Sequence, residues 1–334
     1  MKTLVTGGAG FIGSHLVDAL VRRGDQVVIL DDLSTGRREN VQQHLASGDV
    51  ELVVGSVLDA DLVDDAMASV DACLHLAAAV GVRLVVEQTL DSIRSNVLGC
   101  DTVMTTAARR GRPLLFSSSS EVYGRGDGTP LQEHAPQSVG YRMHARRAYA
   151  CSKMYGESLA QSCVRELGSV MVVARLFNVV GPRQTGTYGM VLPRFIDQAL
   201  AGADLTVFGD GRQSRCFLHV HDAVEALLRL IDSDHLVGGI YNVGSSTPIK
   251  IIDLAQMVIE RTGSSSGVRF VPFDVAYEQG FEDLEHRVPD TTALRDAIGW
   301  AVEKTIEDAV DDVIADLGGR GAGQSISAAL ADAD

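Results

Sequence analysis

Short, fully apolar segments alternate with helix-length segments through the first half of the chain. Each apolar segment has the length of a β-strand, and longer segments with helical periodicity separate them. Strands without alternating polar positions are typical of a parallel sheet that is buried on both faces. The pattern predicts strands over residues 3–6, 26–30, 50–54, 72–76, 114–118 and 170–175, and a helix that begins at about Phe11.

The order of the predicted elements indicates an α/β fold with a Rossmann-type, doubly wound parallel sheet. Beyond residue 181 the pattern becomes irregular, and helical periodicity returns over residues 192–201, 222–231 and 252–261. We therefore expect a first domain over residues 1–180 and a smaller mixed α/β domain over most of residues 181–317. The glycine-rich end, residues 318–334, predicts a flexible tail.

The composition is that of a large globular protein. Of 334 residues, 46% are hydrophobic and 22% are charged, which is enough apolar material for an extensive core. The formal net charge of −15 argues against nucleic acid or an anionic membrane as the main partner. No apolar segment approaches the ~18 residues of a membrane span. Five cysteines without paired spacing indicate reduced thiols in the cytoplasm and predict no zinc site.

Three glycines follow the first predicted strand and open the first predicted helix. Gly7, Gly10 and Gly13 stand three residues apart. The first permits a tight turn, the second lets the backbone approach a diphosphate, and the third lets helix and strand pack closely. The free N–H groups of the helix N-terminus favour negative phosphates. The motif predicts a dinucleotide site, and the alternative is a tight turn beside a solvated acidic loop.

An aspartate at the end of the second predicted strand bears on the choice of dinucleotide. Asp31 follows Gly13 by 18 residues, where a carboxylate accepts hydrogen bonds from an adenosine ribose and repels a 2′-phosphate. This placement predicts NAD. Arg37 and Arg38 keep the alternative of NADP open, because a basic residue there would favour the extra phosphate.

A tyrosine and a lysine four residues apart are candidates for proton transfer. Tyr149 and Lys153 lie in a helical pattern and would share one helix face. A nearby ammonium favours the phenolate, which can take a proton from a hydroxyl that is being oxidised. The serines at residues 117–120 end a predicted strand, so their hydroxyls would share that proton. Alone, such a pair is also typical of a solvated helix face.

Taken together, these motifs resemble the extended short-chain dehydrogenase/reductase family, the NAD-dependent epimerases and dehydratases that act on nucleotide sugars. The resemblance extends to His75-Leu76-Ala77-Ala78, to Asn96-Val97-Leu98-Gly99, and to Arg175-Leu176-Phe177-Asn178 with Gly181-Pro182. It implies a homodimer formed through the helix of Tyr149 and Lys153. It also implies a catalytic set of Ser120, Tyr149 and Lys153, with Ser119 alongside.

The resemblance makes residues 1–180 the NAD-binding domain and residues 181–317 mainly the nucleotide-sugar domain. The residues it implies as NAD contacts are Gly7, Gly10, Phe11, Ile12, Gly13, Asp31, Asp32, Leu76, Ala77, Ala78, Asn96, Tyr149 and Lys153. Those it implies as substrate contacts are Asn178, Arg183, Val207, Phe208, Arg215, Tyr277 and Arg287. Any one of the substrate residues is alternatively an ordinary surface arginine or core aromatic.

Two residues distinguish the reactions within this family. Glu121 follows Ser120 and matches a motif typical of UDP-glucuronate decarboxylases, and Arg287 matches the arginine of their Arg-x-Pro segment. The 4,6-dehydratases carry an aspartate after a threonine, which this chain lacks. Ser119 stands where the decarboxylases have threonine, and it keeps the hydroxyl. The resemblance implies a carboxy-lyase in which Glu121 and Arg287 act on the substrate carboxylate.

The implied reaction is NAD-dependent decarboxylation of UDP-glucuronic acid. Oxidation at C4 gives a ketone β to the C6 carboxylate, CO₂ leaves, and reduction gives UDP-xylose, or UDP-4-keto-xylose is released. One alternative is a 4-epimerase that acts on UDP-glucuronate or UDP-glucose. Another is a non-catalytic NAD-binding protein.

His219 and His221 beside Asp222 suggest a metal site, but a loop or interface is favoured because further ligands are not evident.

Overall fold

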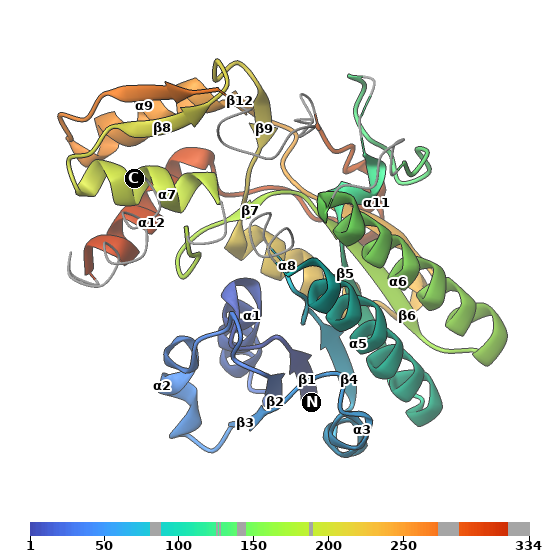
Figure 1. The fold of residues 1–334 in the computed structure, drawn as a ribbon. Helices are drawn as coiled ribbons and strands as arrows, with labels where there is room; N and C mark the ends of the chain where they lie inside the picture. The colour runs from blue at the N-terminus through green and yellow to red at the C-terminus, as the bar shows by residue number, and fades with distance from the viewer. Residues whose placement is uncertain are drawn as a thin grey trace.

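A seven-stranded sheet forms the centre of the molecule in a computed structural model that describes residues 1–80, 88–124, 126, 128–138, 145–186, 190–272 and 287–319 (Figure 1). The strands run in the order β11-β6-β5-β4-β1-β2-β3, and each neighbouring pair is parallel. They are β1 (Lys2–Thr6), β2 (Gln26–Asp31), β3 (Val50–Val54), β4 (Ala72–His75), β5 (Leu114–Ser119), β6 (Met171–Leu176) and β11 (Ile240–Val243). The Rossmann-type α/β fold is confirmed.

The first six strands agree with the sequence prediction to within one residue at each end. The seventh, β11, was missed because Asn242 interrupts its apolar pattern and Gly239 and Gly244 bound it closely. The strand order reverses between β1 and β4, which pair with each other although they lie on opposite sides of this switch. In open α/β sheets, ligands bind at the carboxyl ends of the strands at such a switch point.

Helices cover both faces of the sheet. On one face, α1 (Phe11–Arg22) and α8 (Val220–Ile231) pack their apolar sides, including Leu16, Leu20 and Leu227, into one core. On the other face, α3 (Ala60–Ala68), α5 (Thr89–Arg110) and α6 (Ala145–Leu167) contribute Met67, Met104 and Ala160 to a second core. Fully burying one leucine or methionine side chain stabilises the fold by roughly 1.5–3 kcal/mol.

A third core lies in the C-terminal part, at the upper left of Figure 1. It contains α7 (Val191–Leu200), α9 (Ile251–Thr262) and α12 (Ile306–Gly319), together with the parallel pair β8 (Leu205–Phe208) and β13 (Val268–Val271). The division at residue 180 remains a prediction. Two elements that follow residue 180, α8 and β11, pack in the layers of the central sheet. Gly318 and Gly319, expected in the tail, end α12.

Short elements connect these layers. They are η1 (Arg38–Asn40), α2 (Gln42–Leu45), η2 (Ser120–Tyr123), β7 (Val179–Val180), β9 (Ser214–Cys216), β10 (Leu218–His219), η3 (Asp234–Leu236), β12 (Pro248–Lys250) and α11 (Thr292–Ile298). His219 ends β10 and His221 lies in α8, which begins at Val220, and the His219 ring caps this helix by accepting from the His221 N–H. Within the described ranges, the helices include none long and apolar enough to cross a membrane.

Candidate active site

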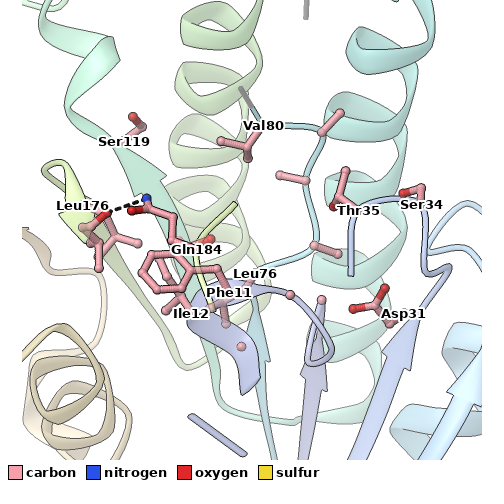
Figure 2. Close-up of a pocket in the computed structure, with 18 of the residues that line it drawn as sticks. Phe11, Ile12, Asp31, Ser34, Thr35, Leu76, Val80, Ser119, Leu176 and Gln184 are labelled. Atoms are coloured by element: carbon pink, nitrogen blue, oxygen red, sulfur yellow. Dashed lines mark hydrogen bonds between the residues drawn. The ribbon is translucent and has the colours of Figure 1, made fainter. Parts of the chain in front are cut away.

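A cavity of about 500 Å³ opens at the carboxyl ends of the central strands. Figure 2 shows Asp31, Ser34 and Thr35 at one end of it and Ser119 and Leu176 at the other. The sequence-predicted residues that line the cavity are Gly7, Gly10, Phe11, Ile12, Gly13, Asp31, Asp32, Leu76, Ala77, Ala78, Ser119, Ser120, Glu121, Tyr149, Lys153, Asn178, Arg183, Arg215 and Arg287. Residues from the whole length of the chain therefore meet at the switch point.

The glycine loop leaves no space for side chains. Gly7 has a φ of +73°, and a Cβ there would lie 2.8 Å from the backbone nitrogen of Ala77. A Cβ on Gly13 would lie 2.1 Å from the Gly7 carbonyl oxygen. The loop brings the N-terminus of α1 to the cavity, where first-turn N–H groups lack partners within the helix. This bare backbone fits the diphosphate of a dinucleotide.

Asp31 presents a buried carboxylate at the far end of the cavity. Its Oδ2 accepts the Ala9 N–H at 2.9 Å, and its Oδ1 accepts the Leu33 N–H at 2.9 Å. Burial raises the pKa of Asp31, and the two backbone bonds oppose that rise. A Cβ on Gly36 would lie 2.8 Å from Oδ1, so the chain keeps the carboxylate's surroundings small. The site fits ribose hydroxyls, and the charge disfavours a 2′-phosphate.

Asn96 lies behind the cavity lining instead of in it. Its side-chain amide pairs with Ala79 in both directions, accepting the backbone N–H at 2.8 Å and donating to the carbonyl at 3.1 Å. This pairing fixes the loop after β4, in which Leu76, Ala77 and Ala78 line the cavity. A direct contact between Asn96 and the cofactor remains a prediction.

Tyr149, Lys153 and the two predicted catalytic serines, Ser119 and Ser120, line the other end of the cavity. Lys153 is buried, donates to the Ser117 carbonyl at 2.8 Å, and places Nζ 5.7 Å from the centre of the Tyr149 ring. Ser119 ends β5, and its hydroxyl accepts the Glu121 N–H at 3.2 Å. Helix α6 holds Tyr149 and Lys153 on one face, as the four-residue spacing predicts.

The environment sets the protonation of this group. Burial raises the pKa of Tyr149, the charge of Glu121 raises it further, and a hydrogen bond with Ser119 opposes both. Burial lowers the pKa of Lys153 to about 8. At neutral pH the structure therefore holds a protonated phenol beside a cationic lysine. Such a phenol can donate to a ketone oxygen, and it becomes a base when added positive charge lowers its pKa.

Glu121 and Arg287 form an ion pair in the cavity wall. The Arg287 Nη1 donates to the Glu121 Oε1 at 2.8 Å and lies 3.3 Å from the Ser120 Oγ. The Arg287 side chain is 3% exposed and that of Glu121 is 18% exposed. The pair stands beside Tyr149, whose pKa it affects through Glu121. Glu121 and Arg287, which were predicted to act on the same substrate carboxylate, therefore lie in contact in the cavity lining.

The predicted substrate residues fall into two groups. Asn178, with a φ of +30°, donates from Nδ2 to the Cys216 carbonyl at 2.9 Å, and Arg215 donates to the Ser214 carbonyl at 2.8 Å. Both line the cavity, as does Arg183, whose Nη2 pairs with Asp18 at 2.7 Å.

Val207 and Phe208 lie outside the cavity lining. The Val207 side chain is fully buried in the third core, and the Phe208 ring packs 4.3 Å from the Arg194 guanidinium. Tyr277 lies outside the described residues. Their contacts with the substrate remain predictions.

Gln184 is a cavity residue that the sequence reasoning missed. It follows the Gly181-Pro182-Arg183 motif, is 7% exposed, and donates to the Val179 carbonyl at 3.0 Å (Figure 2). A polar side chain directly after a motif that turns into the site is the signal that could have found it.

A glycine loop at the switch point of a doubly wound sheet, facing a Tyr–Lys pair, defines a dinucleotide-dependent enzyme of the short-chain dehydrogenase/reductase class. The model of the NAD dependent epimerase/dehydratase family matches residues 3–244. The chain belongs to that family.

Curated relatives and a solved structure are similar over most of the chain. A UDP-N-acetyl-alpha-D-glucosaminuronate decarboxylase of Bacillus cytotoxicus is 38% identical over 88% of this chain and 91% of its own length. UDP-glucuronic acid decarboxylase 2 of Arabidopsis thaliana is 34% identical over 95% of this chain and 68% of its own length. The Thermus thermophilus UDP-glucose 4-epimerase in complex with NAD superposes with a TM-score of 0.84 at 29% identity, covering 96% of this chain and all of that one.

Proposed function

We propose that this protein decarboxylates a UDP-linked hexuronic acid, UDP-glucuronate in the first instance, with NAD as its cofactor. The observation that carries the proposal is the Glu121–Arg287 pair, which stands 2.8 Å apart beside Ser120 in a cavity that also holds Tyr149 and Lys153. Both curated relatives described above are decarboxylases of UDP-linked uronic acids. Their reaction accounts for a carboxylate and a guanidinium at this position.

The glycine loop and Asp31 would hold NAD with its reactive end toward Tyr149. Backbone N–H groups at the start of α1 would bind the diphosphate, and the Asp31 carboxylate would accept the adenosine ribose hydroxyls. When bound, NAD takes the hydride from C4 and can return it after CO₂ has left. Asp31 supports NAD over NADP because its charge repels a 2′-phosphate.

Tyr149 would take the proton of the C4 hydroxyl as that carbon is oxidised. Burial and the charge of Glu121 raise the pKa of Tyr149, and its hydrogen bond with Ser119 opposes them. The Lys153 ammonium, 5.7 Å from the ring centre, would favour the phenolate once substrate is bound. Ser120 stands next to Ser119 and would bond the same substrate oxygen. The two hydroxyls and the phenol then stabilise the enolate oxygen that forms when the β-keto acid loses CO₂.

Glu121 and Arg287 would act on the carboxylate that leaves. Arg287 lines the cavity and holds Glu121 through Nη1, and its guanidinium has further N–H donors, so it would bind a second carboxylate while it holds Glu121. A substrate carboxylate placed there would be oriented by Arg287 and crowded by Glu121. Like-charge repulsion is relieved when CO₂ departs as a neutral molecule.

Residues 181–317 would mainly bind the nucleotide sugar. Arg215 lines the cavity and would bond two phosphate oxygens with its planar guanidinium, and Asn178 borders the same cavity. The name of the Bacillus cytotoxicus relative raises a second candidate substrate that carries an N-acetyl group at C2. The 4-epimerase alternative keeps the same oxidation and retains the carboxylate. The non-catalytic alternative does not account for the meeting of Ser120, Tyr149 and Lys153 in one cavity.

Product mass tests the proposal. The purified protein is incubated with NAD and either UDP-glucuronate or UDP-N-acetylglucosaminuronate, and the product is weighed by mass spectrometry. We expect the loss of one CO₂ from at least one substrate. An isomer of unchanged mass would show an epimerase, and an unchanged substrate with NAD bound would show a non-catalytic protein. The mass also distinguishes the pentose from its 4-keto form.

We further propose a cytoplasmic homodimer formed through α5 and α6, which lie side by side in Figure 1. Leu90 and Leu98 of α5 are 60% and 54% exposed, and Tyr155 of α6 is 38% exposed. A second copy would cover these residues by an isologous contact. Sedimentation at micromolar concentration should give a dimer, and Leu98→Glu should shift it toward monomer. The five cysteines without paired spacing support the location.

A further inference from the structure

Four buried polar side chains form a continuous hydrogen-bonded chain beneath the site. Glu157 of α6 accepts two bonds from Arg175 of β6, to Oε1 at 2.8 Å and to Oε2 at 2.7 Å. The Arg175 Nη1 donates to the Tyr123 hydroxyl at 2.7 Å, and that hydroxyl donates to the Asn242 Oδ1 at 2.6 Å. All four side chains are 3% exposed or less. We name them the Glu157–Asn242 network.

The network is satisfied along its whole length. The Ser118 hydroxyl and the Gln137 amide each donate to Glu157 at 2.5 Å, so its carboxylate accepts four hydrogen bonds. A buried ion pair is costly to desolvate and is a weak source of stability by itself. We therefore ask which parts of the chain the Glu157–Asn242 network connects.

One end of the network fixes the segment that carries Arg287. The Asn242 Nδ2 donates to the Leu131 carbonyl at 2.8 Å and to the Asp290 carbonyl at 3.1 Å. Leu131 also pairs with this segment through its backbone, donating to Val288 at 2.8 Å and accepting from Asp290 at 2.9 Å. Asn242 therefore joins two segments of the chain, one around Leu131 and one that contains Arg287 and Asp290.

The other end fixes the groups of the proton-transfer site. Glu157 lies one helical turn after Lys153 on α6, and Ser118, which bonds Glu157, directly precedes Ser119. Tyr123, in the middle of the network, belongs to the same short helix as Glu121. One set of hydrogen bonds thus joins the backbones that carry Lys153, Glu121 and Arg287.

We propose that the Glu157–Asn242 network is a positioning device that sets the Glu121–Arg287 pair against the Tyr149–Lys153 site. The proposal rests on the decarboxylase function argued above and adds residues that touch neither substrate nor cofactor. Hydride transfer at C4 needs Tyr149 and Lys153, which α6 holds without Tyr123. Loss of CO₂ needs both halves of the site in register, and a displacement of ~1 Å can cost ~10²-fold in rate.

Tyr123→Phe is the sharpest variant, because it removes only the hydroxyl that joins Arg175 to Asn242. We expect NAD affinity and the single-turnover rise of NADH absorbance to stay within about threefold of wild type, while CO₂ release falls about tenfold or more. Tyr241→Phe is the matched control. It makes the same chemical change one residue from Asn242, on a side chain that packs against the core of α1 and α8. Both the NADH rate and the CO₂ rate of this variant should stay at wild-type values.

A second variant and a second readout protect the test from a folding defect or a wrong substrate. Asn242→Asp keeps the acceptor for Tyr123 and removes the amide donor to Leu131 and Asp290. In both variants, hydrogen exchange should accelerate about tenfold or more in peptides that contain the N–H groups of Leu131 and Asp290, and remain unchanged over α1. Exchange needs no substrate, so it tests positioning even where the proposed reaction fails.

The outcomes separate the two proposals. Wild-type protein that releases no CO₂ from either substrate overturns the proposed function, whatever exchange shows. Tyr123→Phe that releases CO₂ at the wild-type rate, or that loses NADH formation and CO₂ release in equal measure, overturns the positioning device. Unchanged exchange at Leu131 and Asp290 in both variants overturns it as well.

Discussion

The guanidinium of Arg287 lies 2.8 Å from the carboxylate of Glu121, although 166 residues separate them in the chain (287 − 121). The pair is largely buried, and its arginine also reaches the Ser120 hydroxyl. Removing one partner of a buried pair leaves an uncompensated charge, which costs more than the pair contributes. A substitution at either residue is therefore expected to change both the reaction in the cavity and the stability of the fold.

Replacing either partner should stop CO₂ release and spare cofactor binding. Glu121→Gln keeps the shape and removes the charge that would crowd the substrate carboxylate, and Arg287→Ala removes the group that would orient it. We expect release of ¹⁴CO₂ from labelled substrate to fall about 10²-fold or more in both, with NAD affinity unchanged. Full CO₂ release by both variants would contradict the assignment.

The two variants should differ in thermal stability. Arg287→Ala leaves the Glu121 carboxylate with neither a counter-charge nor this hydrogen bond. Glu121→Gln also leaves a charge, that of Arg287, without its partner, but the amide oxygen still accepts from the guanidinium. The melting temperature of Arg287→Ala should therefore fall further below wild type, as measured by differential scanning fluorimetry. A melting temperature of Glu121→Gln below that of Arg287→Ala would contradict this prediction.

Tyr149→Phe should abolish oxidation at C4, because the ring remains and the proton acceptor is lost. We expect the single-turnover rise in NADH absorbance to slow about 10²-fold or more. Ser119→Ala should slow it less, since only the hydrogen bond that lowers the Tyr149 pKa is removed. Ser119→Thr, which keeps the hydroxyl, serves as the control and should retain wild-type oxidation.

Asp31→Asn should narrow the preference for NAD over NADP. The amide keeps the shape of the carboxylate and removes the charge that repels a 2′-phosphate, so the ratio of the two dissociation constants should shift toward NADP by about tenfold. Calorimetric titration with both dinucleotides measures it. Asp32→Asn is the matched control, because Asp32 is exposed and should change the ratio less. An equal change of the dissociation-constant ratio in both variants would show that Asp31 does not select NAD over NADP.

Acid should destabilise the protein through its buried histidines. Burial lowers the pKa of His75 from 6.5 to about 3, with the charge of Lys153 adding to the effect, and burial lowers that of His15 to about 4. Below pH 6.5 the unfolded chain takes up protons that the folded chain excludes. Stability is therefore full above pH 6.5 and is lost progressively as the pH falls toward these lowered values.

His75→Asn isolates the contribution of one histidine. Between pH 6.5 and pH 5, urea unfolding of the variant should lose about 2 kcal/mol less stability than wild type, since one fewer proton is taken up on unfolding. Between pH 8 and pH 7 both proteins should show the same change, because His75 is neutral in both states. Parallel curves over the acid range would show that His75 titrates in the folded protein.

Local patterns were sufficient to predict most of the sheet and residues at both ends of the cavity. The apolar strands, the glycine loop with Asp31, and the Tyr149–Lys153 spacing each depend on residues close in the chain, where periodicity and backbone freedom act directly. Strand β11 was not predicted, because Asn242 is a polar residue in the middle of it. This side chain is buried with its hydrogen bonds made to Tyr123, Leu131 and Asp290, which come from distant segments. Asn96 matched a motif, yet its amide is used to hold Ala79.

The sequence by itself determined which chemical groups this protein has, and it predicted the α/β class from short-range order. Only the tertiary structure decided which of those groups meet. Glu121 and Arg287 form an ion pair, and the Arg287 segment is held by a bridge between Leu131 and Pro289 and by the Asn242 amide. Val207 went into a core instead of the cavity. Contacts of this kind depend on packing between distant segments, which no local pattern encodes.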